Sequence, residues 1–532
     1  MDSTEENHKV QDNGEKKADI PVFLAWFPLA LTAFAVSAYV LGRNSPWMLW
    51  AFNLWDYLPV PLSYVLMALT LLFSLPPVLK FVATFVEKLG LTTPNLSSKK
   101  ANRFLRAGLV GVGLFLLFWV FSERRGAIDT YFFIRYAQEG RPFIFKEAGG
   151  TFLFFVALHL ANALGVEHLE ILRIFICGSG VLFIFFLYKL ICLLYEPKVE
   201  RLLAGAFLIV PGYIRLYFGH IEMYGFLLTA VCAYLYFAIR YAKGKNGILP
   251  PALLLGLSTW LHLSAVLLLP SLIYSIHVTG NKEKGGHGRA KVFMKAALFF
   301  IMPFAAFLLV MLMLGYQSWI RDNLVWLLTL LGLHEDPMVA VTATIPFFKP
   351  RVYVLYGNVV SQYTFLSKSH VLFLLNANAI LSPGGLLVCV PLLFLYIRKN
   401  GLRDTTLTFI LIASLSLFLY SLIIYPMYWA YDWDLFSATA FCYTFLAAYL
   451  LMKYFKGRKV VAYLVIYLAS FSLFFVTLPF LSLASMRSIR NAGPFAIEIQ
   501  PFEFINRTMG NPDALMRLDM GRSRDGNLGE SQ

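Results

Sequence analysis

Apolar runs of roughly the length of a membrane-crossing helix recur along almost the whole chain, and polar positions gather between them in short loops and a few longer segments. Because a helix needs about 20 consecutive apolar residues to cross a hydrocarbon core of about 30 Å, this pattern predicts an all-α, polytopic integral membrane protein. We expect about thirteen transmembrane helices. Their predicted ranges are 21–42, 59–86, 104–121, 170–195, 200–218, 223–242, 248–262, 263–278, 293–315, 370–397, 405–426, 436–454 and 460–481.

One apolar segment, 248–278, is too long for a single crossing. As one helix it would be about 46 Å long at 1.5 Å per residue, which exceeds the thickness of the hydrocarbon core. We therefore predict that the helix breaks near His262 and that each part makes a short crossing. His262 itself is expected to be a buried residue with a hydrogen-bond partner close to this break.

The short basic loops set the expected orientation, since Lys and Arg in short loops favour the cytoplasmic side. With the N-terminus inside, every short connection expected in the cytoplasm is basic. These connections are Lys88 to Arg106, Lys189 to Arg201, Arg240 to Lys245, Lys282 to Lys295, Arg398 to Arg403 and Lys453 to Lys459. The agreement requires that 150–165 does not cross, and its 16 residues with His159 and Asn162 inside suit an interfacial or re-entrant helix.

This orientation divides the chain into three parts. We expect a cytoplasmic polar tail at 1–20, a transmembrane domain at 21–481 and a non-cytoplasmic tail at 482–532. The run from Pro21 to Gly42 is too long for the core of a signal peptide and lacks a good cleavage site, so it is expected to be the first span. The long outside segments 122–169 and 316–369 are where function is expected.

Composition agrees with a membrane protein and narrows its partners. Hydrophobic residues make up 59% and charged residues 14% of the chain, whereas soluble domains average about 45–50% and about 25%. The net charge of +15 resides largely in the basic loops, so we expect no nucleic-acid partner. All five cysteines lie in apolar runs, with no C-x-x-C pair and no His at zinc spacing, which favours small core residues.

Asp129 is the first candidate for catalysis. It is expected at the membrane surface beyond the third span, and Arg124 and Arg125 precede it by five and four residues. A carboxylate in this position can act as a base toward a hydroxyl, while the two guanidinium groups hold a phosphate. The alternative interpretation is that Asp129 caps a short helix in a solvated loop.

The first outside segment resembles the GT-C class of membrane glycosyltransferases, and the likeness extends over roughly residues 104–300. The matching stretches are Asp129-Thr130, Gly140-Arg141-Pro142, Lys146-Glu147-Ala148-Gly149-Gly150, Ile171-Leu172-Arg173 and Gly219-His220-Ile221-Glu222. The layout is most similar to that of lipid A aminoarabinose transferases and protein O-mannosyltransferases. In those families an acidic pair opens the loop, and a Glu-Lys-Pro-Pro-like turn precedes a helix that lies on the membrane.

The chain departs from the family pattern at three points. Thr130 stands in place of the second acid, glycines stand in place of both prolines, and two spans precede the span that normally comes first. These departures affect which subfamily and which acceptor the resemblance implies, more than they affect the resemblance to the class.

The resemblance implies a sugar donor on a polyprenyl phosphate or pyrophosphate, a lipid, glycan or protein acceptor, and transfer on the non-cytoplasmic face. Asp129 would then deprotonate an acceptor hydroxyl, which attacks C1 of the sugar while polyprenyl phosphate leaves. The lipid phosphate is already a fair leaving group, so cations need only stabilise its growing charge. The residues expected to bind this phosphate are Arg124, Arg125, Lys146, Arg173 and Arg351.

The turn Gly219-His220-Ile221-Glu222 places two ionisable groups between closely spaced spans. Ionisable groups at membrane depth mark functional sites, because charge is costly there. We expect His220 and Glu222 to face Asp129 across a cavity and to bind sugar hydroxyls, the acceptor or a divalent ion. The alternative is a helix-end pair that extends into the lipid headgroups.

A second aromatic and acidic cluster, Tyr425 to Phe436, ends the eleventh span on the same face. Its Asp432, Trp433 and Asp434 offer carboxylates beside a flat apolar ring, which suits carbohydrate. The Asp-x-Asp pattern also raises the expectation of a divalent metal, for which the remaining oxygen ligands cannot be placed. An interfacial aromatic belt with a helix cap explains the same residues equally well.

We therefore expect a glycosyltransferase, with the bacterial inner membrane as the preferred location and the active site facing the periplasm. An origin in the endoplasmic reticulum stays open. A lipid-linked oligosaccharide flippase or exporter would also need cationic and aromatic cavity residues, but it would not require one outside carboxylate. A polymerase or ligase of surface polysaccharide would keep the chemistry and change the acceptor.

Overall fold

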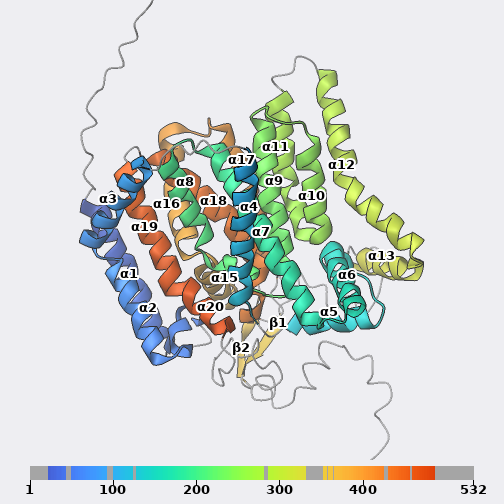
Figure 1. Ribbon diagram of the computed structural model, residues 1–532, viewed down its shortest axis with the longest axis horizontal. Helices are drawn as coiled ribbons and strands as arrows, with labels where there is room; N and C mark the ends of the chain where they lie inside the picture. Colours follow the sequence, from blue (N-terminus) through green and yellow to red (C-terminus); the bar gives the residue numbers. More distant parts are fainter. Residues whose placement is uncertain are drawn as a thin grey trace, which may run out of the picture.

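The computed structural model describes residues 22–43, 49–92, 100–123, 128–280, 286–330, 351–355, 358–363, 365–424, 429–455 and 458–485 (Figure 1). Within these ranges, helices dominate, as predicted. The exception is an antiparallel hairpin of β1 (Arg351–Leu355) and β2 (Asn358–Tyr363). The predicted tail 1–20, most of the tail 482–532 and residues 331–350 of the second outside segment lie outside the described residues.

The N-terminal helices form a unit against the end of the chain. They are α1 (Val22–Arg43), η1 (Trp50–Phe52), η2 (Leu54–Tyr57), α2 (Val60–Leu72) and α3 (Pro76–Thr92). The axes of α2 and α3 meet at 78°, so the predicted span 59–86 is bent. Trp50 and Trp55 of the connecting turns are fully buried, and α3 packs against α19 (Arg458–Phe471).

Segment 122–169 contains short helices and no helix long enough to count as a membrane span among its described residues before α7 begins, as expected. After α4 (Lys100–Val120) come α5 (Ile128–Gln138), η3 (Phe145–Glu147), α6 (Ala148–Leu164) and α7 (His168–Leu194). α6 has 17 residues and ends at Gly165, whose φ of +65° suits a residue without a Cβ. α5 and α6 lie side by side at one end of the molecule, and α6 is too short to count among the membrane-crossing helices (Figure 1).

The break predicted near His262 is present. The middle of the chain consists of α8 (Lys198–Ile209), η4 (Gly212–Tyr217), α9 (Tyr224–Ala242), α10 (Leu249–Leu261), η5 (Leu263–Leu268) and α11 (Leu269–Gly280). His262 has extended backbone angles (φ −155°, ψ 128°) between α10 and η5. It is buried, and its Nδ1 lies 2.7 Å from the hydroxyl of Ser264. Both the burial of His262 and its hydrogen-bond partner near the break are therefore confirmed.

The remaining helices complete the bundle. They are α12 (Gly286–Met313), α13 (Gln317–Leu330), α15 (Lys368–Leu381), α16 (Pro383–Asn400), α17 (Thr405–Ile423), η6 (Trp429–Phe436), α18 (Ser437–Tyr454), the π-helical turn η7 (Ser472–Thr477) after α19, and α20 (Leu478–Ser485). Pro383 disfavours helical angles at Ser382, and α15 and α16 meet there at 105°.

In the described part of the chain, seven helices are long and apolar enough to cross a membrane, or nine if each bent pair counts as one span. Of the other four predicted spans, 104–121, 248–262 and 263–278 correspond to shorter apolar helices, and 200–218 contains the 12-residue α8 followed by η4. These helices support a polytopic membrane protein, and the number of thirteen spans stays a prediction.

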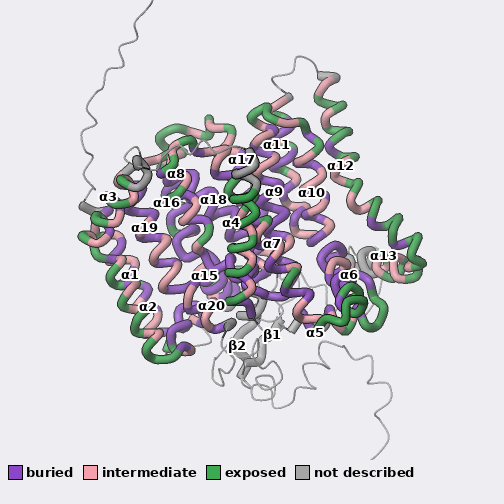
Figure 2. The backbone as a smooth tube through the Cα atoms, in the orientation of Figure 1, coloured by how far each residue is buried: buried purple, intermediate pink, exposed green. Residues whose placement is uncertain are grey.

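The burial pattern separates a packed interior from an apolar exterior. In the apolar stretch Trp433–Tyr454, which contains α18, 89% of the most apolar residues are buried. In the stretch Gly288–Met313 of α12, only 17% are buried, and Figure 2 shows this contrast. Large apolar side chains are exposed along α4 and α12, including Leu109 at 64% and Leu298 at 66%. Such extensive exposed apolar surface is typical of helices that face lipid.

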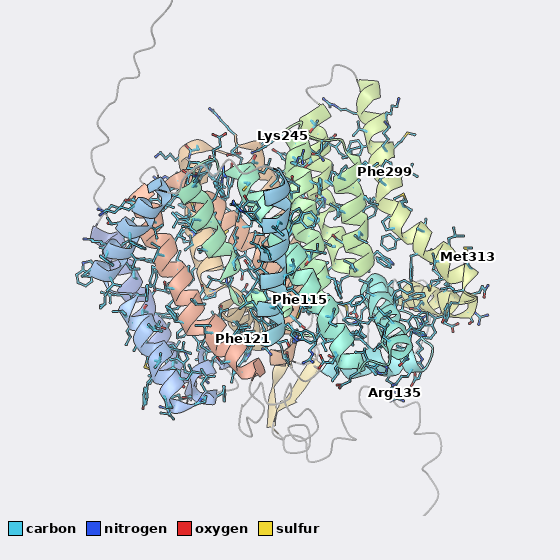
Figure 3. All side chains as sticks on the ribbon, viewed as in Figure 1. Phe115, Phe121, Arg135, Lys245, Phe299 and Met313 are labelled. Atoms are coloured by element: carbon cyan, nitrogen blue, oxygen red, sulfur yellow. The ribbon has the colours of Figure 1, made fainter. Side chains whose placement is uncertain are left out.

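The two ends of the bundle differ. Lys245, just after α9, lies at one end, whereas Arg135 of α5 lies at the opposite end with Phe121 nearer to it (Figure 3). The hairpin β1–β2 and helices α5 and α6 occupy the end that contains Arg135 (Figure 1). This end, which we call the loop end, is where the charged residues of interest converge.

Candidate functional site

The segment between α8 and α9 forms a buried turn at the loop end. Arg215 of η4, His220 and Glu222 are each exposed by only 1–3%. Gly219 has a φ of +75°, and a Cβ at this position would lie 2.6 Å from Cβ of Ser122. Glycine therefore allows the turn to approach the end of α4 closely.

His220 bridges two carboxylates from distant parts of the sequence. Its Nδ1 lies 3.2 Å from Oε2 of Glu123, and its Nε2 lies 3.0 Å from Oδ2 of Asp434. Burial alone would lower the pKa of His220, but hydrogen bonds and charge attraction from Asp434 and Glu123 outweigh it and raise the pKa to about 10. At neutral pH His220 is therefore an imidazolium that donates a hydrogen bond from each ring nitrogen.

Arg215 completes this charged network. Its Nη2 lies 3.6 Å from Oε2 of Glu123, and its guanidinium carbon lies 3.9 Å from the ring centroid of Phe480 and 5.3 Å from that of Trp433. Two carboxylates and two cations give a formal charge of zero, which offsets part of the cost of burying them. We call Glu123, Arg215, His220 and Asp434 the charged cluster.

Arg173 adds a third buried cation beside this cluster. It lies near the start of α7, is 5% exposed and forms an ion pair with Glu170. Its Nη1 lies 3.4 Å from the carbonyl oxygen of Glu123, and its guanidinium carbon lies 5.0 Å from the ring centroid of Trp119. Arg173, which was predicted to bind the donor phosphate, therefore donates a hydrogen bond to the main chain at the end of α4.

A smaller polar group surrounds the start of α6. Nζ of Lys146 lies 2.9 Å from Oε1 of Glu147, and the same oxygen lies 3.9 Å from Nε2 of His262. The Lys146 side chain is 54% exposed, whereas that of Glu147 is 6% exposed. Lys146 therefore remains accessible to a ligand while its carboxylate partner is buried.

The structure explains why glycines follow Glu147. A Cβ on Gly149 would lie 2.5 Å from the ring of Trp260, and one on Gly150 would lie 2.6 Å from Cβ of Met223. The first turn of α6 thus packs closely against α10 and against the turn before α9. A proline or any larger residue at these positions would require that packing to change.

The residues on either side of segment 124–129, Glu123 and Thr130, contact the same turn. The backbone N–H of Glu123 donates to the carbonyl of Phe218 at 2.7 Å, and the hydroxyl of Thr130 donates to the carbonyl of Ile221 at 2.9 Å. Thr130 is fully buried at 0% exposure. Residues 124–127 lie outside the described residues, and the main chain of Asp129 belongs to the first turn of α5.

Several predicted site residues come together. His220, Trp433 and Asp434 are in contact, with the rings of His220 and Trp433 5.0 Å apart, and the N–H of Glu222 donates to the carbonyl of His220 at 2.8 Å. Trp433 is fully buried between His220, Arg215 and Phe480, so its ring packs directly against the charged cluster. The predicted residues whose side chains lie outside the described part are Arg124, Arg125, Asp129, Arg351 and Asp432.

Sequence reasoning did not select Glu123 and Arg215. Arg215 lies inside the apolar run 200–218, and an ionisable residue within such a run is a signal that could have identified it. Glu123 lies at the end of a predicted span, where acidic residues are common and carry little information. Only the fold, which places the end of α4 against the turn before α9, identifies its role.

Metal ligands were predicted around Asp432 and Asp434. In the part of the chain that the structure describes, no three His, Cys, Asp or Glu side chains are placed so that they could hold a metal ion. Because the side chain of Asp432 is not described, this prediction stays untested.

Comparison with known proteins identifies no relative: no family model matches the chain, and neither a curated protein nor a solved structure matches it. The likeness to GT-C enzymes in the first outside segment therefore stays a prediction. Function has to be argued from the site itself.

Proposed function

We propose that this protein is a glycosyltransferase of the GT-C type, with about thirteen spans, that moves a sugar from a polyprenyl-phosphate donor to a hydroxyl acceptor on the non-cytoplasmic face. The supporting observation is the buried charged cluster at the loop end, directly beside the helix that bears Asp129. Buried charged groups are costly, and membrane proteins retain ionisable residues in their interior where they serve function.

The positions of the cations fit a donor with a phosphate group. Lys146 is half exposed at the start of α6, and Arg173 is buried near the start of α7. α6 packs against α5, and α7 packs against α6. An anionic headgroup at this end would pair with the half-exposed Lys146, and charge-assisted contacts of this kind are the strong ones.

In the proposed reaction Asp129 takes the proton of the acceptor hydroxyl, and the acceptor oxygen forms a bond to C1 of the sugar. The bond between C1 and the phosphate oxygen breaks, and the electron pair leaves with the polyprenyl phosphate. Lys146 and Arg173, with Arg124, Arg125 and Arg351, stabilise the charge that develops on the phosphate. Glu222 and Asp434 are the proposed contacts to sugar or acceptor hydroxyls.

No step of this proposal runs through a metal ion. The Oδ2 atom of Asp434 lies 3.0 Å from Nε2 of His220, and a protonated imidazole at that distance disfavours a second cation on the same oxygen. The buried donor set around Asp434 therefore fits a cationic side chain better than a divalent metal.

Asp129→Asn tests the proposal, since it removes the base and keeps the size of the side chain. Purified protein in nanodiscs would be offered polyprenyl phosphates that carry each of a panel of sugars, with radiolabel in the sugar. We expect transfer to fall by about 10²–10⁴-fold while donor binding persists. Asp322→Asn is the matched control, because Asp322 is an exposed carboxylate on α13 with a side chain 59% exposed.

Transfer by Asp129→Asn at a near wild-type rate would remove Asp129 from the role of base. Glu222, Asp432 and Asp434 would then be tested in that order. Translocation of intact donor by both wild type and variant, without cleavage of the sugar–phosphate bond, would support the flippase alternative.

A further inference from the structure

We propose that α7 and α9 together bind the headgroup of an anionic phospholipid at the end of the bundle opposite to the loop end. Both helices end there, since Nζ of Lys243, just after α9, donates to the carbonyl of Leu193 in the last turn of α7 at 3.2 Å. Figure 3 labels Lys245 at this end. We call the site the basic patch, and its residues are Phe185, Phe186, Lys189, Tyr236, Phe237 and Arg240.

Aromatic rings join the two helices within the basic patch. The ring centroid of Phe186 on α7 lies 6.5 Å from that of Tyr236 and 6.3 Å from that of Phe237, which are both on α9. Phe185 adjoins Phe186 at 5.2 Å, and Tyr236 adjoins Phe237 at 4.8 Å. Phe185 is 49% exposed, and the other three side chains are partly exposed. The four rings therefore form one continuous surface across α7 and α9.

Each helix adds one cation to this aromatic surface. Nζ of Lys189 lies 5.5 Å from the ring centroid of Phe185, and the guanidinium carbon of Arg240 lies 5.6 Å from that of Tyr236. Nη1 of Arg240 also donates to the hydroxyl of Tyr236 at 2.9 Å. Both cations follow their aromatic partner by four residues, so their main chains lie about one helical turn nearer to the Lys245 end.

The two cations of the basic patch have no carboxylate partner in the part of the chain that the structure describes. Arg240 donates to the hydroxyl of Tyr236 and to the carbonyl of Lys245, which are both neutral acceptors. Lys189 lies over the ring of Phe185 and is exposed. Because an ion pair with an anion is the strong form of contact for both side chains, the patch is complementary to a phosphate group.

Further cations beside the patch increase the positive charge. Burial lowers the pKa of Lys243, and the positive charges of Lys245 and Lys453 lower it further. Asp404 acts in the opposite direction, but its carboxylate oxygens already accept hydrogen bonds from Tyr449 and from two backbone N–H groups of α17. Like charges crowd together at this end, and an anion bound there would relieve their repulsion.

The surface next to the patch favours a lipid over a free phosphate ion. Leu182, Phe185, Phe186 and Lys189 are spaced so that they share one face of α7. Leu182 is 54% exposed, which extends the apolar surface away from the cations. A phospholipid would use both features, with its phosphate on Lys189 and Arg240 and an acyl chain on the apolar surface, whereas a free ion would use the cations alone. Basic sites between membrane helices bind anionic headgroups in this way.

The test measures lipid binding to the full-length protein in detergent by native mass spectrometry. The probes are dioleoylphosphatidylglycerol, which is anionic, and dioleoylphosphatidylcholine, which has no net charge. We expect wild type to bind the anionic lipid at least about tenfold more tightly, and Lys189→Gln combined with Arg240→Gln to weaken its binding by about 10–30-fold. Lys189→Gln alone, at an exposed position where the fold should not change, should weaken it by about fivefold.

Arg398→Gln combined with Lys399→Gln is the matched control. It also removes one arginine and one lysine, both of them exposed at the end of α16 and outside the patch. This control should keep wild-type affinity within about twofold. Equal affinity of wild type for the two lipids, or equal losses in the two double variants, would overturn the proposal.

Inorganic phosphate distinguishes a lipid from a free anion. Retention of the anionic lipid by wild type in the presence of excess millimolar phosphate supports the proposed site. Complete displacement of the lipid by phosphate would show that the patch binds a free ion, and the assignment to a phospholipid would be wrong. No sugar donor enters these measurements, so failure of the proposed glycosyltransferase activity would leave their outcome unchanged.

Discussion

Replacement of His220 by Gln should show how much the charged cluster contributes to stability. The change removes a cation whose two ring nitrogens lie 3.2 and 3.0 Å from the carboxylates of Glu123 and Asp434. The side chains of Glu123 and Asp434 are only 3% and 7% exposed, so water cannot replace the lost partner fully. The amide of Gln can donate one or two hydrogen bonds, but it carries no charge.

The expected magnitude follows from this geometry. Loss of one partner from a buried ion pair typically costs about 3–5 kcal/mol. Glu123 keeps its ion pair with Arg215 at 3.6 Å, which places the expected loss at the lower end, about 3 kcal/mol. Addition of Asp434→Asn to His220→Gln should recover part of this loss, because the second change removes a buried charge.

The stability difference between His220→Gln and wild type should depend on pH in a definite direction. A histidine whose pKa is raised to about 10 in the folded protein contributes its full stabilisation below its unfolded pKa of about 6.5 and loses it as pH rises through 10. The deficit of His220→Gln relative to wild type should therefore be largest near pH 6 and shrink steadily toward pH 10. Groups that titrate in both proteins cancel in this difference.

Unfolding in detergent, followed by intrinsic fluorescence as SDS is added, measures this free energy at each pH. His277→Gln is the control, because His277 is exposed near the end of α11, and it should leave stability unchanged at every pH. A His220→Gln variant with wild-type stability, or a deficit that is flat from pH 6 to 10, would refute the assignment of a buried imidazolium.

Three further predictions concern orientation, donor binding and packing. Single cysteines at positions 285 and 402 should be protected from impermeant thiol reagents in intact cells, and a single cysteine at position 340 should react with them. The reverse pattern of labelling would place the loop end in the cytoplasm. Lys146→Gln should weaken binding of polyprenyl phosphate by about tenfold at unchanged protein stability, because the Lys146 side chain is half exposed; wild-type affinity, measured by fluorescence titration, would contradict its role. Gly149→Ala should destabilise the protein by about 1–3 kcal/mol in the SDS titration, because the added Cβ would overlap Trp260, whereas Gly178→Ala has open space and should not; equal stability of the two variants would contradict the packing.

The spacing of apolar segments and the charge of the loops predicted much of the fold. The break at His262 followed from length alone, since one helix over 248–278 would be too long for the bilayer, and the structure places the break there. The short α6 was expected because a crossing at 150–165 would have put basic loops on both sides. The bend at Pro383 was not anticipated, although proline after a helix is a signal that such a break leaves in sequence.

The candidate site was less accessible to sequence reasoning. His220 and Asp434 were selected because they are ionisable residues near span ends, and the fold brings them into contact across 214 residues of sequence. Glu123 could not be selected, because its ion-pair partners Arg215 and His220 lie far along the chain. Pairing of this kind is decided by how the helices pack, which neither helix periodicity nor loop charge predicts.

Cleavage of the donor in proteoliposomes tests the central claim most directly. Wild-type protein would be reconstituted with a radiolabelled polyprenyl-phosphate sugar and a panel of lipid, glycan and peptide acceptors. The proposed glycosyltransferase predicts that free polyprenyl phosphate forms in equal amount to glycosylated acceptor, and that Asp129→Asn abolishes both products. Movement of the intact donor across the bilayer, with no polyprenyl phosphate released by wild type, would contradict it.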